Sequence, residues 1–193
     1  LRKIKLNLPL DHPDFDRQYV AQLADLVRTS PLGAAVILAH DQPYTEQGEV
    51  LDIGKGLFVP NDYVLQLARE HPQFLPAISI HPARRDALAE LDRCLAAGAV
   101  MMKLLPNCQN IDCCRPQYQP FWEKMAAAGL PLLAHTGGEH TVPVVNSAWA
   151  DPRPLELPLA CGVKVIAAHC GTGSGLFDPD YFRRFRAMAE TFP

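Results

Sequence analysis

The chain has 193 residues, 48% of them hydrophobic, and a formal net charge of -3. This length suits one domain with a substantial core, and the slightly acidic balance without long Lys/Arg runs excludes a nucleic-acid-binding or anionic-membrane class. No apolar stretch approaches the roughly 20 residues of a membrane span and no signal peptide opens the chain, so we expect a soluble, cytoplasmic protein.

Amphipathic helical patterns recur along the chain from residue 16 onward. Residues 1–14 precede them and are expected to form an N-terminal extension or loop. Three of the patterns end at a glycine, as helix C-termini often do: Gly98, Gly129 and Gly162. The predicted helices cover residues 16–30, 61–71, 84–98, 116–129, 154–162 and 179–192.

Short apolar segments alternate with these helices. They are "AAVILAHD" (34–41), "FLPAISIHP" (74–82), "AVMMKLLP" (99–106), "LPLLAHTGG" (130–138) and "VKVIAAHCG" (163–171). Nearly continuous apolar strands between helices indicate a parallel sheet covered on both faces. A closed (β/α) barrel and an open doubly wound sheet both fit this pattern. No G-x-G-x-x-G follows the first strand, which disfavours a dinucleotide-binding open sheet.

One connection is much longer than the others. Residues 42–60, "QPYTEQGEVLDIGKGLFVP", are polar and contain three glycines. Loops of this length are uncommon inside a compact domain and often lie over a functional site. Because this loop follows a strand, we expect it to form a lid or wall of a pocket at the strand-end face.

A polar residue marks the end of every predicted strand: His40, His81, Lys103, His135 and His169. The ends of parallel barrel strands meet at one mouth, and imidazoles gathered there are good ligands for zinc and similar ions. Glycine-containing turns follow His135 and His169, which makes these two the stronger candidates. His40 and His81 fit a substrate-lining role and a structural role equally well. A buried ammonium is costly, so a lysine at a strand end usually extends to water. This is the structural alternative for Lys103.

The six cysteines do not form a recognisable zinc or disulfide pattern. Cys108, Cys113 and Cys114 share one loop, but no C-x-x-C pair has a second pair at zinc-finger spacing. Free thiols in a reducing cytoplasm are the favoured interpretation.

The stretches "KLLPN", "LPLLAHTGG" and "VKVIAAHCG", in that order and spacing, resemble strands four to six of the amidohydrolase superfamily, and its amidohydrolase-related branch most closely. The resemblance covers residues 15–190 and implies a distorted (β/α)₈ TIM barrel. It also implies one or two divalent metals at the mouth, zinc in the first place and manganese or iron as alternatives. By this resemblance His135 and His169 would be metal ligands, with His169 also catalytic, and Lys103 would be a carbamylated lysine bridging two metals.

Two expected parts of the family pattern are missing. The chain has no H-x-H pair at a first strand, because His12 has no second histidine near it, and no aspartate at an eighth strand, because Asp178 and Asp180 follow the sixth. We therefore expect residues 1–193 to form a single partial TIM-barrel domain of about five parallel strands with flanking helices. Five strands cannot close a standard barrel, so sheet edges and apolar surface would stay open and could pair with another copy as a homo-oligomer.

The resemblance implies a metal-dependent hydrolase that acts on a small-molecule carbonyl compound, an amide, lactone or similar, through a metal-activated water. His169 would hold the metal or the oxyanion. One alternative is a non-oxidative, metal-dependent decarboxylase of the same branch. Another is an inactive, truncated domain that serves as a binding or assembly unit. The sequence does not choose the substrate.

Overall fold

The computed structural model describes residues 9, 11–54, 56–173, 175 and 178–192. Within this part of the chain, five strands form one sheet in the order β1-β2-β3-β4-β5, and every neighbouring pair is parallel. The strands are β1 (Ala35–Leu38), β2 (Phe74–Ile78), β3 (Met101–Leu104), β4 (Leu132–His135) and β5 (Val165–Ala168). A doubly wound sheet reverses its strand order at a switch point, so this consecutive order selects the barrel type.

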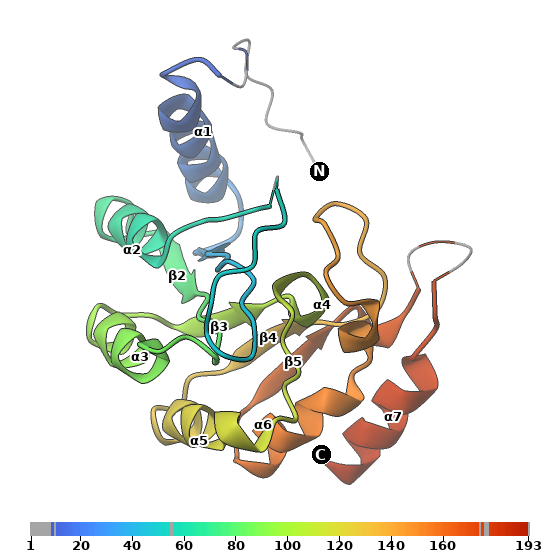
Figure 1. Cartoon of the computed structure of the whole chain (residues 1–193). Helices are drawn as coiled ribbons and strands as arrows, with labels where there is room; N and C mark the ends of the chain where they lie inside the picture. The colour runs from blue at the N-terminus through green and yellow to red at the C-terminus, as the bar shows by residue number, and fades with distance from the viewer. Residues whose placement is uncertain (1–8, 10, 55, 174, 176–177, 193) are drawn as a thin grey trace.

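The helices follow one another in an arc around the outside of the sheet (Figure 1). The longer ones are α1 (Phe15–Thr29), α2 (Asn61–Glu70), α3 (Ala87–Ala96), α5 (Gln119–Ala127), α6 (Glu156–Ala160) and α7 (Phe182–Thr191). Shorter turns are α4 (Pro106–Gln109), η1 (Pro116–Tyr118), η2 (Ser147–Ala150), η3 (Arg153–Leu155) and η4 (His169–Gly171). Gly98, Gly129 and Gly162 follow helices with φ of 93°, 65° and 88°, which confirms the predicted helix ends.

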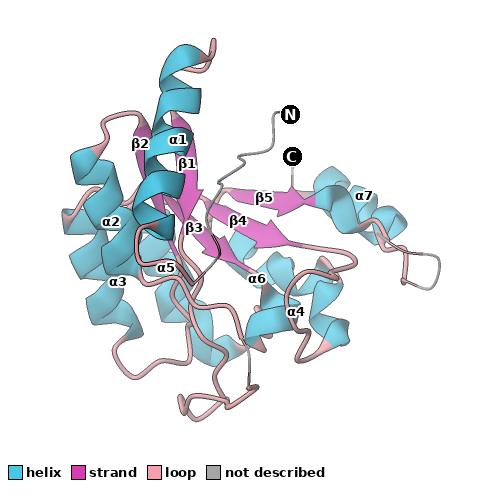
Figure 2. Ribbon diagram, turned by 90° about the horizontal axis from the view of Figure 1, so that it is seen from above, coloured by secondary structure: helices cyan, strands magenta, loops and turns pink. Residues whose placement is uncertain are grey.

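The core lies between the sheet and this layer of helices. Figure 2 shows α2, α3 and α5 together on one side of the sheet. Trp122 of α5, Leu91 of α3 and Ile78 of β2 are fully buried in one cluster. The Trp122 indole N–H donates to the Cys113 carbonyl at 3.2 Å, so this large side chain is buried without an unpaired polar atom.

The opposite, inner face of the sheet is only partly covered by the described residues. Side chains on β1 alternate, with Ala35 and Ile37 packed toward α1 and α2, while Val36 is 39% and Leu38 is 42% exposed. Through the strand register, Leu75 and Ile166 lie on the same inner face and are 38% and 48% exposed. Ala77 and Lys103 on this face are buried, so among the described residues the expectation of a sheet covered on both faces holds only in part. In a closed barrel, apolar side chains from the strands fill the interior, which explains why these strands are apolar. Five strands do not close a barrel, so some of these side chains stay exposed.

The long loop 42–60, described except for residue 55, lies over the carboxyl ends of β1 and β2. His40 and Val59 exchange both backbone hydrogen bonds at 2.9 Å, so the loop returns to the end of β1. The side chain of Asn110 donates to the Tyr44 carbonyl at 3.0 Å, which ties the loop to the segment after β3. The loop thus lies at the face where we expected a lid or wall.

Two further expectations concern the chain termini and membranes. Most of the expected N-terminal extension 1–14, namely residues 1–8 and 10, lies outside the described residues. Of the helices that are described, none is both long and apolar enough to cross a bilayer.

Candidate active site

The carboxyl ends of the five parallel strands place the predicted site residues at one edge of the sheet. Lys103 lies within β3 and His135 is the last residue of β4, while His169 directly follows β5. His40 and His81 follow β1 and β2 after one and two further residues. Lys103 pairs with Leu133 and His135 with Ala168, so their side chains project from the inner face.

His135 and His169 are brought together as neighbours. Their ring centroids are 4.9 Å apart and the planes meet at 61°. The backbone turns sharply here, because His169 and Cys170 have φ of 65° and 54°. Non-glycine residues seldom adopt this left-handed conformation, and it persists where surrounding contacts fix it, often at functional sites.

Those contacts come from the segment after β4. The Thr136 hydroxyl donates to the Ala168 carbonyl at 2.7 Å and accepts the Gly171 N–H at 2.9 Å. Gly137 has φ of 89°, and a Cβ there would lie 2.1 Å from the Thr172 carbonyl oxygen. The glycine expected for a close approach is therefore required at this position, since any side chain would push the two strand-end turns apart.

The surroundings of His135 favour its neutral form. Its Nε2 lies 3.2 Å from the Gly138 carbonyl oxygen, which can only accept, so this contact favours a proton on Nε2. Burial lowers the pKa of His135 and the nearby Lys103 ammonium lowers it further, whereas the Glu139 carboxylate opposes the shift. The other ring nitrogen, Nδ1, lies 3.8 Å from the Glu139 carboxylate.

Lys103 is buried against this group, with 8% of its surface exposed. Burial lowers its pKa to about 8, although the Glu139 carboxylate opposes the shift. A lysine with this pKa is partly an uncharged amine at neutral pH. The Lys103 side chain therefore does not extend to water. A lysine at an exposed strand end would do so.

His40 and His81 occupy different settings. Both ring nitrogens of His40 are buried without a hydrogen-bond partner among the described residues, and burial lowers its pKa, with Lys103 adding to the effect. His81 accepts the Ala83 N–H at Nδ1 (3.1 Å), and its ring lies 5.1 Å from that of Tyr44. Burial lowers the pKa of His81 to about 4. His81 Nε2 is also buried without a hydrogen-bond partner among the described residues. His40 lies within electrostatic reach of Lys103.

Glu139 is a site residue that the sequence reasoning missed. One carboxylate oxygen accepts the Thr141 backbone N–H, the Thr141 hydroxyl at 2.6 Å and the Val142 N–H at 3.2 Å. The other oxygen faces His135. Its position four residues after His135, in "HTGGEH", was the available signal. These bonds fix a carboxylate beside the two imidazoles and Lys103.

Buried polar side chains also hold the strand ends in register. Gln109 accepts the Leu105 N–H at 2.7 Å and donates to the Ser79 hydroxyl at 3.0 Å and the Asp41 carbonyl at 3.1 Å. Asp41 accepts the His81 N–H at 2.8 Å and Arg84 Nη1 at 3.1 Å. Nothing in the spacing of these residues pointed to this network, because its members are up to 68 positions apart.

The potential for metal binding is partial. Across the described ranges, no group of three or more His, Cys, Asp or Glu side chains has the geometry to hold a metal ion. All six cysteines have free thiols. The pair His135 and His169 supplies only two side chains, so a metal site built on them would need further ligands.

Comparisons with known proteins agree with this fold. The family model described as Amidohydrolase matches residues 12–193. An uncharacterized TIM-barrel protein from Bordetella bronchiseptica superimposes with a TM-score of 0.64 at 15% identity, covering 94% of this chain and 59% of that one. A candidate 2-pyrone-4,6-dicarboxylic acid hydrolase from Pseudomonas putida gives 0.55 at 17% identity, covering 90% of this chain and 54% of that one.

A second candidate 2-pyrone-4,6-dicarboxylic acid hydrolase, from Acinetobacter baumannii with citric acid bound, has a TM-score of 0.55 at 17% identity, covering 86% of this chain and 55% of that one. The comparison with curated proteins gave no match. The chain therefore spans between 54% and 59% of the length of these three structures and shares their TIM-barrel fold.

Proposed function

The chain belongs to the amidohydrolase family, and on this premise we propose that it forms part of a metal-dependent hydrolase for a small-molecule carbonyl compound. The observation that carries the proposal is the adjacent pair of imidazoles, His135 and His169, 4.9 Å apart at their centroids. Buried Lys103 and the fixed carboxylate of Glu139 lie beside them. Together they form a compact polar group on an otherwise apolar sheet face.

His135 and His169 would hold a divalent metal, zinc in the first place, or manganese or iron. The Glu139 carboxylate, 3.8 Å from His135 Nδ1, would favour a cation at this point. A bound metal would supply Lewis acidity, lowering the pKa of water and polarising a carbonyl. Catalytic zinc generally has three protein ligands, so at least one more would come from Lys103 as a carbamate or from outside the described residues.

The side chains of this chain suit distinct tasks. Burial favours the neutral form of His135, which is the state that a ligand needs, and the contact with Gly138 orients the ring. His169 is exposed at the rim, so it can also contact substrate or a developing oxyanion. Glu139, fixed by Thr141 and Val142, can accept a proton near the reacting carbon. The low pKa of Lys103 provides the uncharged amine that adds carbon dioxide to form a carbamate.

A cyclic ester is a suitable first substrate. Two solved structures of the same fold are named as candidate 2-pyrone-4,6-dicarboxylic acid hydrolases, and a 2-pyrone is a lactone. Ring-opening of a pyrone that stops with a chelator and returns with zinc or manganese would support the proposal. Carbon dioxide release without ring-opening would favour the decarboxylase alternative. Absence of both activities and of bound metal would favour the binding or assembly alternative.

Metal content gives a direct test without a substrate. We expect purified protein to retain zinc or a similar ion, measured by mass spectrometry, and to lose most of it in His135→Asn and His169→Asn. His71→Asn is the matched control, because His71 precedes β2 at the opposite edge of the sheet. Equal metal content in all four proteins would contradict the assignment of the two ligands.

A further inference from the structure

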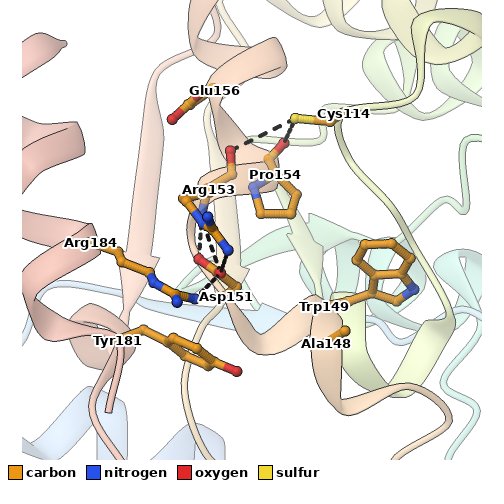
Figure 3. A pocket seen from close by; sticks show the side chains of 9 residues that line it. All are labelled: Cys114, Ala148, Trp149, Asp151, Arg153, Pro154, Glu156, Tyr181 and Arg184. Carbon is orange, nitrogen blue, oxygen red and sulfur yellow. Dashed lines mark hydrogen bonds and ion pairs between the residues drawn. The ribbon is translucent and has the colours of Figure 1, made fainter. Parts of the chain in front are cut away.

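A cleft lies next to the candidate site, and none of the five predicted site residues lines it. Its volume is ≈ 430 Å³, within the range of small-molecule pockets. Figure 3 shows its walls, which come from the loop at Cys114, from residues 148–156 and from the start of α7. The Cys114 thiol lies 3.3 Å from the Pro154 carbonyl, which joins two of these walls.

Two arginines converge on one buried carboxylate in this cleft (Figure 3). Asp151 accepts Arg153 Nε at 2.9 Å and Nη2 at 2.6 Å, and Arg184 Nη1 at 2.5 Å. The Asp151 side chain is 7% exposed, whereas those of Arg153 and Arg184 are 59% and 46% exposed. One carboxylate cannot use all the N–H donors of two guanidinium groups. Within the described residues, Arg153 Nη1 and Arg184 Nε and Nη2 have no hydrogen-bond partner.

Two aromatic side chains complete the walls. Trp149 and Tyr181 both line the cleft, and the Arg184 guanidinium lies 5.0 Å from the centre of the Tyr181 ring. This contact holds the arginine at the wall while its free edge remains available. Aromatic walls with a few charged donors are typical of sites for planar anionic ligands. Glu156 also lines the cleft and would disfavour a ligand with a second negative charge.

The cleft is joined by backbone hydrogen bonds to the turns that carry the histidines. The Gly137 N–H donates to the Ala150 carbonyl at 2.8 Å, and the Tyr181 N–H donates to the Gly171 carbonyl at 2.7 Å. Two of the three walls are therefore bonded to a residue two positions after His135 or His169. A ligand in the cleft would contact segments that are hydrogen-bonded to the turns of the two histidines.

We propose that this cleft is a binding site for a small planar monocarboxylate. The ligand carboxylate pairs with the free N–H groups of Arg153 and Arg184, and its ring packs against Trp149 and Tyr181. The site is separate from the proposed hydrolase reaction and does not depend on a bound metal.

Tryptophan fluorescence provides a local readout for this proposal. The chain has two tryptophans, and Trp122 is 0% exposed, so a ligand can reach only Trp149. With benzoate as the probe, we expect a saturable change in fluorescence with a Kd of about 1 mM or tighter. Benzamide, which has the same shape without the charge, should bind at least about tenfold more weakly. Absence of saturation, or equal binding of benzamide, would overturn the proposal.

Two substitutions locate the ligand, and two others serve as controls. Arg153→Gln and Arg184→Gln should each weaken benzoate binding about tenfold, measured by calorimetry on proteins whose circular dichroism matches the parent. Arg186→Gln is one control, because Arg186 lies on α7 like Arg184 but pairs with Glu190 at 3.5 Å. Unchanged affinity in both arginine variants would refute the site. Loss of benzoate binding in a His169→Asn variant whose circular dichroism matches the parent would also refute it, because His169 does not line the cleft.

Discussion

Replacement of Gly137 by alanine tests whether the contact between the two strand-end turns builds the site. The new Cβ would lie 2.1 Å from the Thr172 carbonyl oxygen and 3.1 Å from the Gly171 carbonyl carbon. Both atoms belong to backbone, so neither can rotate away. Relief of the clash must move the turn of His169 away from that of His135.

The expected cost has two separable parts. Alanine at a φ of 89° loses about 1–2 kcal/mol from left-handed backbone strain. Overpacking against rigid backbone adds about 1–3 kcal/mol. We therefore expect Gly137→Ala to lower the free energy of unfolding by about 2–5 kcal/mol. This is a large fraction of the total stability of a typical domain, about 5–15 kcal/mol.

Gly98 offers a matched control for the cost of left-handed backbone strain. It has φ of 93°, yet a Cβ there would meet nothing within 4 Å. Gly98→Ala should therefore cost only the strain of about 1–2 kcal/mol. Urea denaturation followed by circular dichroism measures both variants, and metal content reports whether the histidine pair has separated. An equal loss of stability in the two variants would refute the close approach at Gly137.

Three other predictions test the buried polar groups and the open sheet face. Lys103 has a folded pKa of about 8, below its unfolded value, so protonation disfavours the folded state. The free energy of unfolding of the parent should therefore rise as the pH increases above about 8. Lys103→Met should be more stable than the parent at pH 7, and this difference in the free energy of unfolding should shrink between pH 7 and 10 in urea titrations. A constant advantage would contradict the burial of the amine.

Gln109→Leu should lower the free energy of unfolding by about 1–3 kcal/mol, because buried partners lose their hydrogen bonds, whereas exposed Gln66→Leu should change it little. Sedimentation velocity should show self-association of the chain that Leu38→Lys reduces and Leu88→Lys, on the outer surface of α3, does not. Equal effects of Gln109→Leu and Gln66→Leu would contradict the buried hydrogen bonds of Gln109. Equal effects of Leu38→Lys and Leu88→Lys would contradict self-association through the inner face of the sheet.

Much of the fold followed from local patterns in the sequence. The alternation of apolar segments and amphipathic helices predicted five parallel strands, because burial and helix periodicity are properties of short stretches. Position at a strand end also placed Lys103, His135 and His169 at one edge, since parallel strands in consecutive order share their carboxyl ends. The prediction of an incomplete barrel is confirmed by the exposed inner face of β1 and β5.

Tertiary structure alone decided which side chains meet. Glu139 faces His135 across a bend at residues 136–138, and Gln109 reaches Asp41 across 68 positions. The left-handed turn at His169 depends on contacts with Thr136, which no local pattern encodes. Strand position is fixed by burial of nearby residues, whereas the direction of a side chain at a turn depends on contacts between segments distant in the sequence. The strands and the residues at their ends were therefore predictable from the sequence, whereas the contacts that Glu139 and Gln109 make were not.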